Sequence, residues 1–343
     1  MIPQTLFFKI YPCCIPVKGF GRSIIYDLNR SVFSYIPNSL FELLQDCEGQ
    51  TISTIKESID QENWKVLDKY FVFLQDNEYI LFCKTEEELK QFPAIELSYE
   101  APCGISNAIL QIKDELKVNV PNLIVDLSAL GCRFIQVVFH GEGDFNLVSK
   151  VLSYFDKSAF RSVEVLVKYN VHFSESMLSQ LVNKYRRIHH LIVYNSPQNR
   201  ILKNFHFGMQ AISYNTRMID YSLKRSRIDA SDFRPNIDLF CESQGFHTYF
   251  NQKVVIDIQG NIKNVPNTDH SFGNVNNVSL AEVIQTEEFQ ALWCLKKDDI
   301  EICKECEYRH MCVDNRIPER IGSQWKHNEK CNYDVYNCLW NHN

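Results

Sequence analysis

The chain has 343 residues, of which 45% are hydrophobic and 23% charged, and its formal net charge is −6. This length exceeds the usual size of one hydrophobic core, so we expect two or three domains, and the charge balance argues against nucleic acid as a partner. No apolar run approaches the roughly 18–20 residues of a membrane span, and the first residues lack a basic leader and a small-residue cleavage site, so we expect a cytoplasmic protein with no membrane partner.

Residues 1–88 predict a small α+β domain. Strands are predicted at residues 5–10, 23–28, 31–36 and 78–83, and helices at residues 38–49, 51–59 and 63–77. Asn29 and Arg30 separate two of these strands and suit a hairpin turn. The order of elements is that of a winged-helix domain, and on the residues alone it fits a structural domain without a ligand equally well.

Residues 89–240 alternate strands with helices. Strands are predicted at residues 94–100, 133–143, 161–169 and 189–195, and helices at residues 107–116 and 122–130. Near-continuous apolar strands of this kind are typical of a parallel α/β sheet or a partial barrel. A full eight-unit barrel needs about 200–250 residues and does not fit in this segment.

Residues 241–343 are rich in turn-forming residues and in cysteine. Seven of the thirteen cysteines lie in this segment, at positions 241, 294, 303, 306, 312, 331 and 338. In a reducing compartment, clustered cysteines indicate metal binding rather than disulfides. We therefore expect a C-terminal domain that folds around a metal.

The spacing of four thiols predicts the ligands. Cys303 and Cys306 form a C-x2-C pair, Cys312 follows five residues later, and Cys331 can return as the fourth ligand. Four thiolates suit either tetrahedral zinc or a [4Fe–4S] cluster, and spacing does not separate the two.

The stretch "WCLKKDDIEICKECEYRHMC" (residues 293–312) resembles the C-terminal SPASM domain of radical SAM peptide-modifying enzymes, which carry auxiliary iron–sulfur clusters. The resemblance implies one [4Fe–4S] cluster on the four cysteines just named and favours iron–sulfur over zinc. It also implies that a second auxiliary cluster is lost. Cys241 matches one of its early ligands, but Val265 and Arg316 stand where two further cysteines are expected.

Radical SAM chemistry requires a C-x3-C-x2-C motif, and this sequence has none. The corresponding stretch (residues 95–110) contains Cys103 alone, so we do not expect cleavage of S-adenosylmethionine. The strand that resembles the family's Gly-Gly-Glu-Pro strand ends here in His140-Gly141-Glu142-Gly143. This polar strand end is either a remnant of the fold or a repurposed pocket, in which case His140, Glu142 and Cys103 are the catalytic candidates.

Residues 27–59 are similar to the recognition elements of ribosomally synthesised, post-translationally modified peptide (RiPP) pathways. In such modules the leader of a precursor peptide adds as a strand beside the third strand and lies against the third helix. The similarity predicts these peptide-binding residues: Val32, Phe33, Ser34, Tyr35, Ile36, Leu67 and Tyr70.

Taken together, "VKGFGRS", "CEYRHMCVDNR" and "KCNYDVYNCLW" resemble the grasp-with-spasm peptide maturases, which lack the radical SAM cysteines. The resemblance implies a graspetide pathway whose partners are a precursor peptide and an ATP-grasp ligase. The chain has no phosphate-binding loop of its own. A leader-binding scaffold is the first hypothesis; an enzyme that uses the cluster for electron transfer or the barrel for a non-radical reaction is the second, and a zinc-stapled interaction protein is the third.

Overall fold

The computed structural model describes residues 2–113, 115–141, 144–202, 211–218, 228–230, 233–266 and 268–341. The chain forms two compact units, each built from several segments of the sequence. Unit 1 contains residues 1–99, 227–248 and 295–343, and unit 2 contains residues 100–226 and 249–294. The division into three domains at residues 88 and 240 stays a prediction.

The N-terminal part of unit 1 follows the predicted order of strands and helices, with one strand more. Its strands are β1 (Phe7–Ile10), β2 (Cys14–Val17), β3 (Ser23–Asp27), β4 (Val32–Ile36) and β5 (Ile80–Cys83). Its helices are α1 (Asn38–Cys47), α2 (Ile52–Glu57), η1 (Gln61–Asn63), α3 (Trp64–Asp76) and α4 (Glu86–Leu89). The sequence analysis missed β2, which contains Pro16 and lies at a sheet edge, where proline is tolerated.

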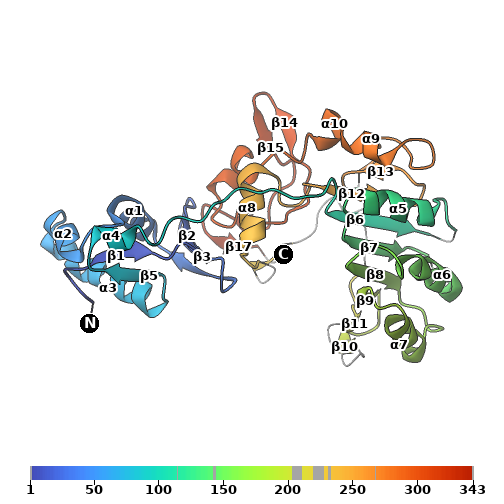
Figure 1. Ribbon diagram of the computed structural model, residues 1–343, viewed down its shortest axis with the longest axis horizontal. Helices are drawn as coiled ribbons and strands as arrows, with labels where there is room; N and C mark the ends of the chain where they lie inside the picture. Colours follow the sequence, from blue (N-terminus) through green and yellow to red (C-terminus); the bar gives the residue numbers. More distant parts are fainter. Residues whose placement is uncertain are drawn as a thin grey trace. The chain divides into compact units, whose positions relative to one another are not determined.

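Strands β2, β3 and β4 form an antiparallel sheet in that order, and β1 pairs with β5 (Figure 1). All five residues of β3 are buried, because both faces of this sheet are covered. On one face, Ile25 packs with the core of helices α1, α2 and α3. On the other face, Ile24 and Tyr26 pack with residues of the cysteine-rich C-terminal segment.

The rest of unit 1 has short elements joined by loops. These are α8 (Ile237–Gly245), η3 (Lys297–Asp299), η4 (Cys303–Glu305), β14 (Glu319–Ile321), β15 (Gln324–Lys326), β16 (Tyr333–Asp334) and β17 (Leu339–Trp340). The hairpins β14–β15 and β16–β17 each form a separate two-stranded sheet. With so little regular structure, this segment needs another source of stability, as the sequence analysis expects.

Unit 2 is built on an open eight-stranded sheet with the order β10-β11-β9-β8-β7-β6-β12-β13. The strands are β6 (Asn107–Ile112), β7 (Phe134–Phe139), β8 (Ser162–Lys168), β9 (Ile188–Tyr194), β10 (Arg200–Leu202), β11 (Ala211–Tyr214), β12 (Lys253–Ile256) and β13 (Ile262–Lys263). The helices are α5 (Val120–Ala129), α6 (Phe145–Phe155), α7 (Glu175–Lys184), α9 (Leu280–Ile284) and α10 (Glu287–Gln290). The six inner strands are parallel, and helices α5, α6 and α7 cover one face of the sheet (Figure 1).

Two of the elements predicted between residues 94 and 116 are wrong. Residues 94–100 form no strand, and residues 107–112, within a predicted helix, form strand β6. A short buried apolar run cannot be assigned to helix or strand by its periodicity alone, and here it pairs with strands on both sides. The predictions of β7, β8, β9 and α5 are confirmed.

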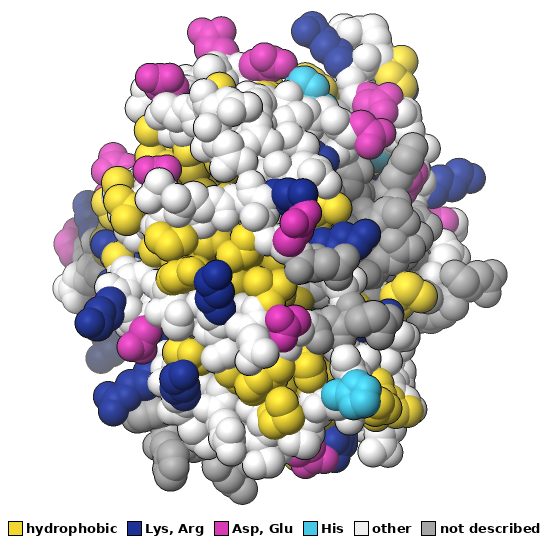
Figure 2. Space-filling model, turned by 90° about the vertical axis from the view of Figure 1, so that its right-hand side faces the viewer, with side chains coloured by type: hydrophobic (Ala, Val, Ile, Leu, Met, Phe, Trp, Pro, Cys, Tyr) yellow, Lys and Arg dark blue, Asp and Glu magenta, His cyan; other side chains and the backbone are white. Residues whose placement is uncertain are grey.

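The molecular surface mixes hydrophobic and charged side chains. Figure 2 shows a face on which hydrophobic side chains are exposed in groups between charged side chains of both signs. Such a mixture is ordinary for a folded protein. Among the described residues, none of the helices has the length and apolar character needed to cross a membrane.

Candidate metal centre

The four predicted thiol ligands lie together. Cys303, Cys306, Cys312 and Cys331 all line one cavity of about 140 Å³ within unit 1. None of them forms a disulfide. The structure thus brings together residues that are up to 28 positions apart in the sequence, as the spacing predicts.

The four sulfur atoms are not drawn together as tightly as the ligands of a single ion. No three of these four Sγ atoms lie within 4.8 Å of one another. Tetrahedral zinc, with Zn–S bonds of about 2.3 Å, holds its sulfurs about 3.8 Å apart. In a [4Fe–4S] cluster each cysteine binds a different iron, so the sulfurs lie farther apart.

The backbone around the first ligands is unusual. Ile302, directly before Cys303, has a φ of 70°, a left-handed conformation that is an outlier for a β-branched residue. The chain then forms the short helix η4, which begins at Cys303 and is followed directly by Cys306. The amide of Tyr333 lies 3.4 Å from Cys331 Sγ. Amide hydrogen bonds of this kind stabilise cysteine sulfurs bound to iron.

A buried set of charged residues shares the cavity. Lys297 and Asp314 are each 2–3% exposed, and Lys297 Nζ lies 3.7 Å from Asp314 Oδ2. The Arg316 guanidinium donates to both oxygens of the same carboxylate. Burial opposes the negative charge of Asp314, but Lys297 and Arg316 outweigh it and hold the pKa of that carboxyl well below its usual range.

The positive charges of Lys297 and Arg316 favour a negatively charged group in the cavity. Burial, followed by the Arg316 charge, lowers the pKa of His327 to about 4, so its ring is neutral at pH 7 and leaves Lys297 and Arg316 as the cations. Burial raises the pKa of Cys312 to about 12. Without a bound group the buried thiol therefore stays protonated, and metal binding must release its proton. Four thiolates around either zinc or a cluster give a net negative charge, which Lys297 and Arg316, less the charge of Asp314, offset in part.

Each residue at a position of the second cluster is described within its own unit. Val265 is fully buried in the core of unit 2, and Arg316 forms the ion pair described above. Cys241 is also buried, with its sulfur 4.0 Å from the carbonyl oxygen of Glu96. Neither Cys241 nor Cys338 is among the residues that line the four-cysteine cavity.

A separate group of three donors lies at the start of the chain. Cys13, Cys14 and Asp27 have ligand atoms within 4.8 Å of one another. The Asp27 carboxylate, however, already accepts from Arg30 Nε at 2.5 Å and from the amides of Asn29 and Arg30. Two thiols then remain, too few for a tetrahedral site.

The catalytic candidates of unit 2 are not brought together. Cys103 precedes β6, at the amino ends of the parallel strands, whereas His140 follows β7, at the carboxyl ends. Six residues of strand, about 20 Å, separate these two edges of the sheet. Glu142 lies outside the described residues. Because the strand expected before Cys103 does not form, the loop after the first strand of the sheet is residues 113–119, which contain no cysteine.

A row of polar residues crosses the sheet face opposite the helices. His190 Nε2 lies 2.6 Å from Ser213 Oγ, and His190 Nδ1 lies 3.5 Å from Glu164 Oε1. This order of groups is that of a Ser-His-acid triad. Ser213, however, lies within β11, which is paired on both sides, so its backbone amides serve the sheet and offer no oxyanion hole. We therefore interpret Glu164, His190 and Ser213 as polar side chains that contact one another across neighbouring strands of the sheet.

The predicted peptide-binding residues lie along β4 and α3. Val32 and Tyr35 are 48% and 42% exposed, while Phe33 and Ser34 are half-buried. Ile36 and Leu67 lie in the core of the N-terminal part. Tyr70 is half-buried, with its hydroxyl 2.7 Å from Ser39 Oγ. Within the described residues β4 pairs with β3 alone, so its outer edge is open.

Comparison with known protein families gives one match, which covers part of the cysteine-rich segment. Residues 249–307 match the SPASM family, an iron–sulfur cluster-binding domain. The matched segment includes Cys303 and Cys306 and ends before Cys312. It also includes β12 and β13 of unit 2. A search of curated protein sequences gives no match.

Solved structures of Streptococcus suis SuiB align with the chain at 10% identity. The structure bound to S-adenosylmethionine aligns over 91% of this chain and 94% of SuiB, with a TM-score of 0.33. The structure bound to the precursor peptide SuiA aligns over 90% and 95%, with a TM-score of 0.26. At these scores the alignments do not establish a common fold.

Sequence reasoning found the four thiols but missed the charged residues around them. Lys297, Asp314 and His327 are ordinary polar residues in the sequence, and their burial beside the cysteines appears only in the fold. The one available signal was the change from cysteine to Arg316 in the resemblance to the SPASM pattern.

Proposed function

We propose that this chain is a peptide-maturation protein of a RiPP pathway of the graspetide type. Its N-terminal part is a winged-helix recognition element that holds the leader of a precursor peptide, and it assists a partner ATP-grasp ligase. The observation that carries the proposal is the open edge of β4 in the same compact unit as a four-thiol cavity. An open strand edge offers backbone hydrogen bonds to an incoming peptide strand.

In this proposal the cavity holds one [4Fe–4S] cluster. The SPASM match supports a cluster over zinc, as does the finding that no three of the four sulfurs lie within 4.8 Å of one another. Four protein thiolates leave no iron open to a substrate, so the cluster would stabilise the fold or transfer electrons. Radical cleavage of S-adenosylmethionine is not part of the proposal, because the sequence has no three-thiol motif.

Leader binding is tested with labelled peptides. The probes are fluorescein-labelled N-terminal segments of the small proteins encoded next to this gene, titrated against the full chain by fluorescence anisotropy. Tyr70→Ala should weaken binding about tenfold, on the order of 1.4 kcal/mol, because the resemblance expects the leader to lie against the third helix, where Tyr70 is half-buried. The control is Val72→Ala, an exposed position about 160° around the same helix. Equal affinity in both variants contradicts a role of Tyr70 in leader binding. A failure of every probe to bind contradicts the proposed function in peptide maturation.

Metal content is the second test. Iron, sulfide and zinc are measured on anaerobically purified protein together with an absorption spectrum. Near four iron and four sulfide per chain supports the cluster. One zinc without sulfide supports the zinc-stapled scaffold instead and removes the electron-transfer role.

A further inference from the structure

The turn between β2 and β3 docks onto the loop that carries Cys306. The amide of Phe20 donates to the carbonyl oxygen of Glu305 at 2.8 Å, and the Arg309 guanidinium donates to the carbonyl oxygen of Lys18 at 2.6 Å. We call this contact, between residues 18–22 and residues 305–309 together with residues 335–338, the junction. It joins the two stretches "VKGFGRS" and "CEYRH", which lie almost three hundred positions apart.

Two glycines make this close approach possible. A Cβ atom on Gly19 would lie 2.9 Å from Glu307 Cβ, and a Cβ atom on Gly21 would lie 2.6 Å from Cys338 Sγ. Real Cβ atoms essentially never approach other atoms so closely. Both positions therefore require glycine for as long as the junction is formed.

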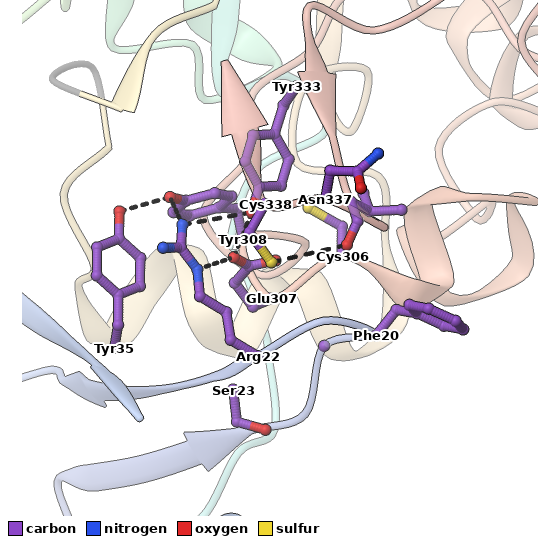
Figure 3. Close-up of polar contacts among 12 residues, drawn as sticks. Phe20, Arg22, Ser23, Tyr35, Cys306, Glu307, Tyr308, Tyr333, Asn337 and Cys338 are labelled. Atoms are coloured by element: carbon purple, nitrogen blue, oxygen red, sulfur yellow. Dashed lines mark hydrogen bonds and ion pairs between the residues drawn. The ribbon is translucent and has the colours of Figure 1, made fainter. Parts of the chain in front are cut away.

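Arg22 occupies the centre of the junction (Figure 3). Its Nε donates to Glu307 Oε1 at 2.8 Å, and another guanidinium nitrogen donates to the Tyr308 hydroxyl at 3.0 Å. The guanidinium also lies 3.6 Å from the centre of the Tyr35 ring. Glu307 is fully buried and accepts a further hydrogen bond from Tyr333 at 2.5 Å. Charge-assisted bonds of this kind are strong and directional, so they fix how the two stretches lie against each other.

Tyr308 connects the open edge to a predicted ligand. Its hydroxyl lies 2.5 Å from the hydroxyl of Tyr35, which is on the edge strand β4 (Figure 3). Tyr308 follows Cys306 by two residues and lines the same cavity as the four cysteines. Tyr35 is 42% exposed, whereas Tyr308 is 1% exposed. A single buried residue therefore touches both the proposed peptide-binding strand and the proposed cluster site.

We infer that occupation of the four-cysteine site and the order of the β4 edge are coupled through Tyr308 and the junction. Residues 303–312 contain little regular structure, so metal–thiolate bonds order them. That order fixes Tyr308, which in turn fixes Tyr35 and the edge strand. By linkage, a peptide strand bound at β4 favours the loaded site to the same degree. This last step rests on the proposed leader binding; the coupling of edge and site does not.

Hydrogen–deuterium exchange of the full chain tests the coupling without any peptide. Exchange is compared between anaerobically purified, loaded protein and protein from which the metal has been removed with a chelator. The amides of β4 should exchange at least about fivefold faster after removal, the low end of typical coupling between sites. The amides of β1 and β5, in the same unit but outside the junction, should be unchanged. Unchanged β4 exchange, or an equal increase in all three strands, overturns the inference.

The hydroxyl of Tyr35 tests whether the coupling runs through its contact with Tyr308. Tyr35→Phe removes the contact with Tyr308 and keeps the ring; in loaded protein it should raise β4 exchange toward the metal-free level, and in metal-free protein it should change little. The matched control is Tyr336→Phe, whose ring is 52% exposed and contacts Phe20. A Tyr35→Phe effect of equal size in both forms would show that the hydroxyl stabilises the strand without coupling it to the site.

The same preparations separate this inference from the proposed function. A labelled leader segment should bind loaded protein more tightly than metal-free protein, by the factor measured in β4 exchange. Equal affinity for the two forms contradicts the coupling. If no leader segment binds either form, the proposed function fails, and the exchange comparison alone decides whether edge and site are coupled.

Discussion

Replacing either partner of the Arg22–Glu307 ion pair should destabilise unit 1, but by different amounts. Glu307 is fully buried, whereas the Arg22 side chain keeps 26% of its surface exposed. Arg22→Gln leaves a buried carboxylate without its cation, which costs about 3–5 kcal/mol. Glu307→Gln leaves an arginine that water can still reach, and it loses a charge-assisted hydrogen bond worth about 1.5–3 kcal/mol.

The measurement is urea denaturation of the full chain at matched metal content, monitored by tryptophan fluorescence. Trp340 is a suitable reporter because its ring centre lies 5.7 Å from that of Tyr308. The double variant Arg22→Gln/Glu307→Gln should be more stable than Arg22→Gln alone, because it buries no unpaired charge. Lys18→Gln is the control. Lys18 lies in the same turn as Arg22, and its exposed ion pair with Glu42 should contribute at most about 1 kcal/mol. A double variant as unstable as Arg22→Gln, or equal costs for the two single variants, would refute the reasoning.

Three further predictions concern other parts of the chain. Cys306→Ala should remove the iron of purified protein, while Cys294→Ala, at an exposed cysteine outside the cavity, should leave iron per chain unchanged. Gly21→Ala should lower the free energy of unfolding by about 1–3 kcal/mol, because its Cβ has no room at the junction. In unit 2, burial raises the pKa of Asp257, but the Lys263 ammonium 2.9 Å away and hydrogen-bonded amides outweigh it, so the folded pKa lies below the unfolded value. The carboxylate therefore stabilises the fold above about pH 4 and loses this effect as pH falls through the folded pKa. Asp257→Asn should lower the melting temperature clearly at pH 7, and the difference from the wild type should shrink progressively as the pH is lowered below about 4.

The sequence predicted those elements whose signal is local. The alternation in β3 and β4 and the capping Thr51 of α2 are visible in a few residues, and the structure confirms both strands and the cap. Strand β6 was assigned to a helix because its apolar run is buried on both sides by partners distant in the sequence. The C-x2-C spacing likewise indicated the thiols, because two ligands on one turn are a local feature.

The surroundings of the thiols depend on long-range packing and could not be predicted in the same way. Lys297 lies six residues before Cys303, and no local pattern shows that it is 2% exposed and paired with Asp314. The junction depends on Gly19 and Gly21 meeting a loop from the other end of the chain. The stretch "VKGFGRS", which the sequence analysis used only as part of a resemblance, forms this contact in the structure.

The shared core of unit 1 leads to a prediction about the N-terminal part alone. Val17, Ile24, Tyr26 and Leu28 are at most 5% exposed because they pack against the C-terminal segment. A fragment of residues 1–88 would expose these four side chains, at about 1.5–3 kcal/mol each, or about 6–12 kcal/mol in total. A whole domain has a stability of about 5–15 kcal/mol.

We therefore expect the fragment of residues 1–88 to be unfolded or aggregated, with no cooperative melting transition by circular dichroism. A fragment in which these four residues are replaced by polar residues is the control, since it removes the exposed apolar face and should be the more soluble of the two. A cooperatively folded wild-type fragment that binds a leader segment as tightly as the full chain does would show that the recognition element is independent of the metal centre. That result would contradict the shared core of unit 1 and, with it, the role given to the junction.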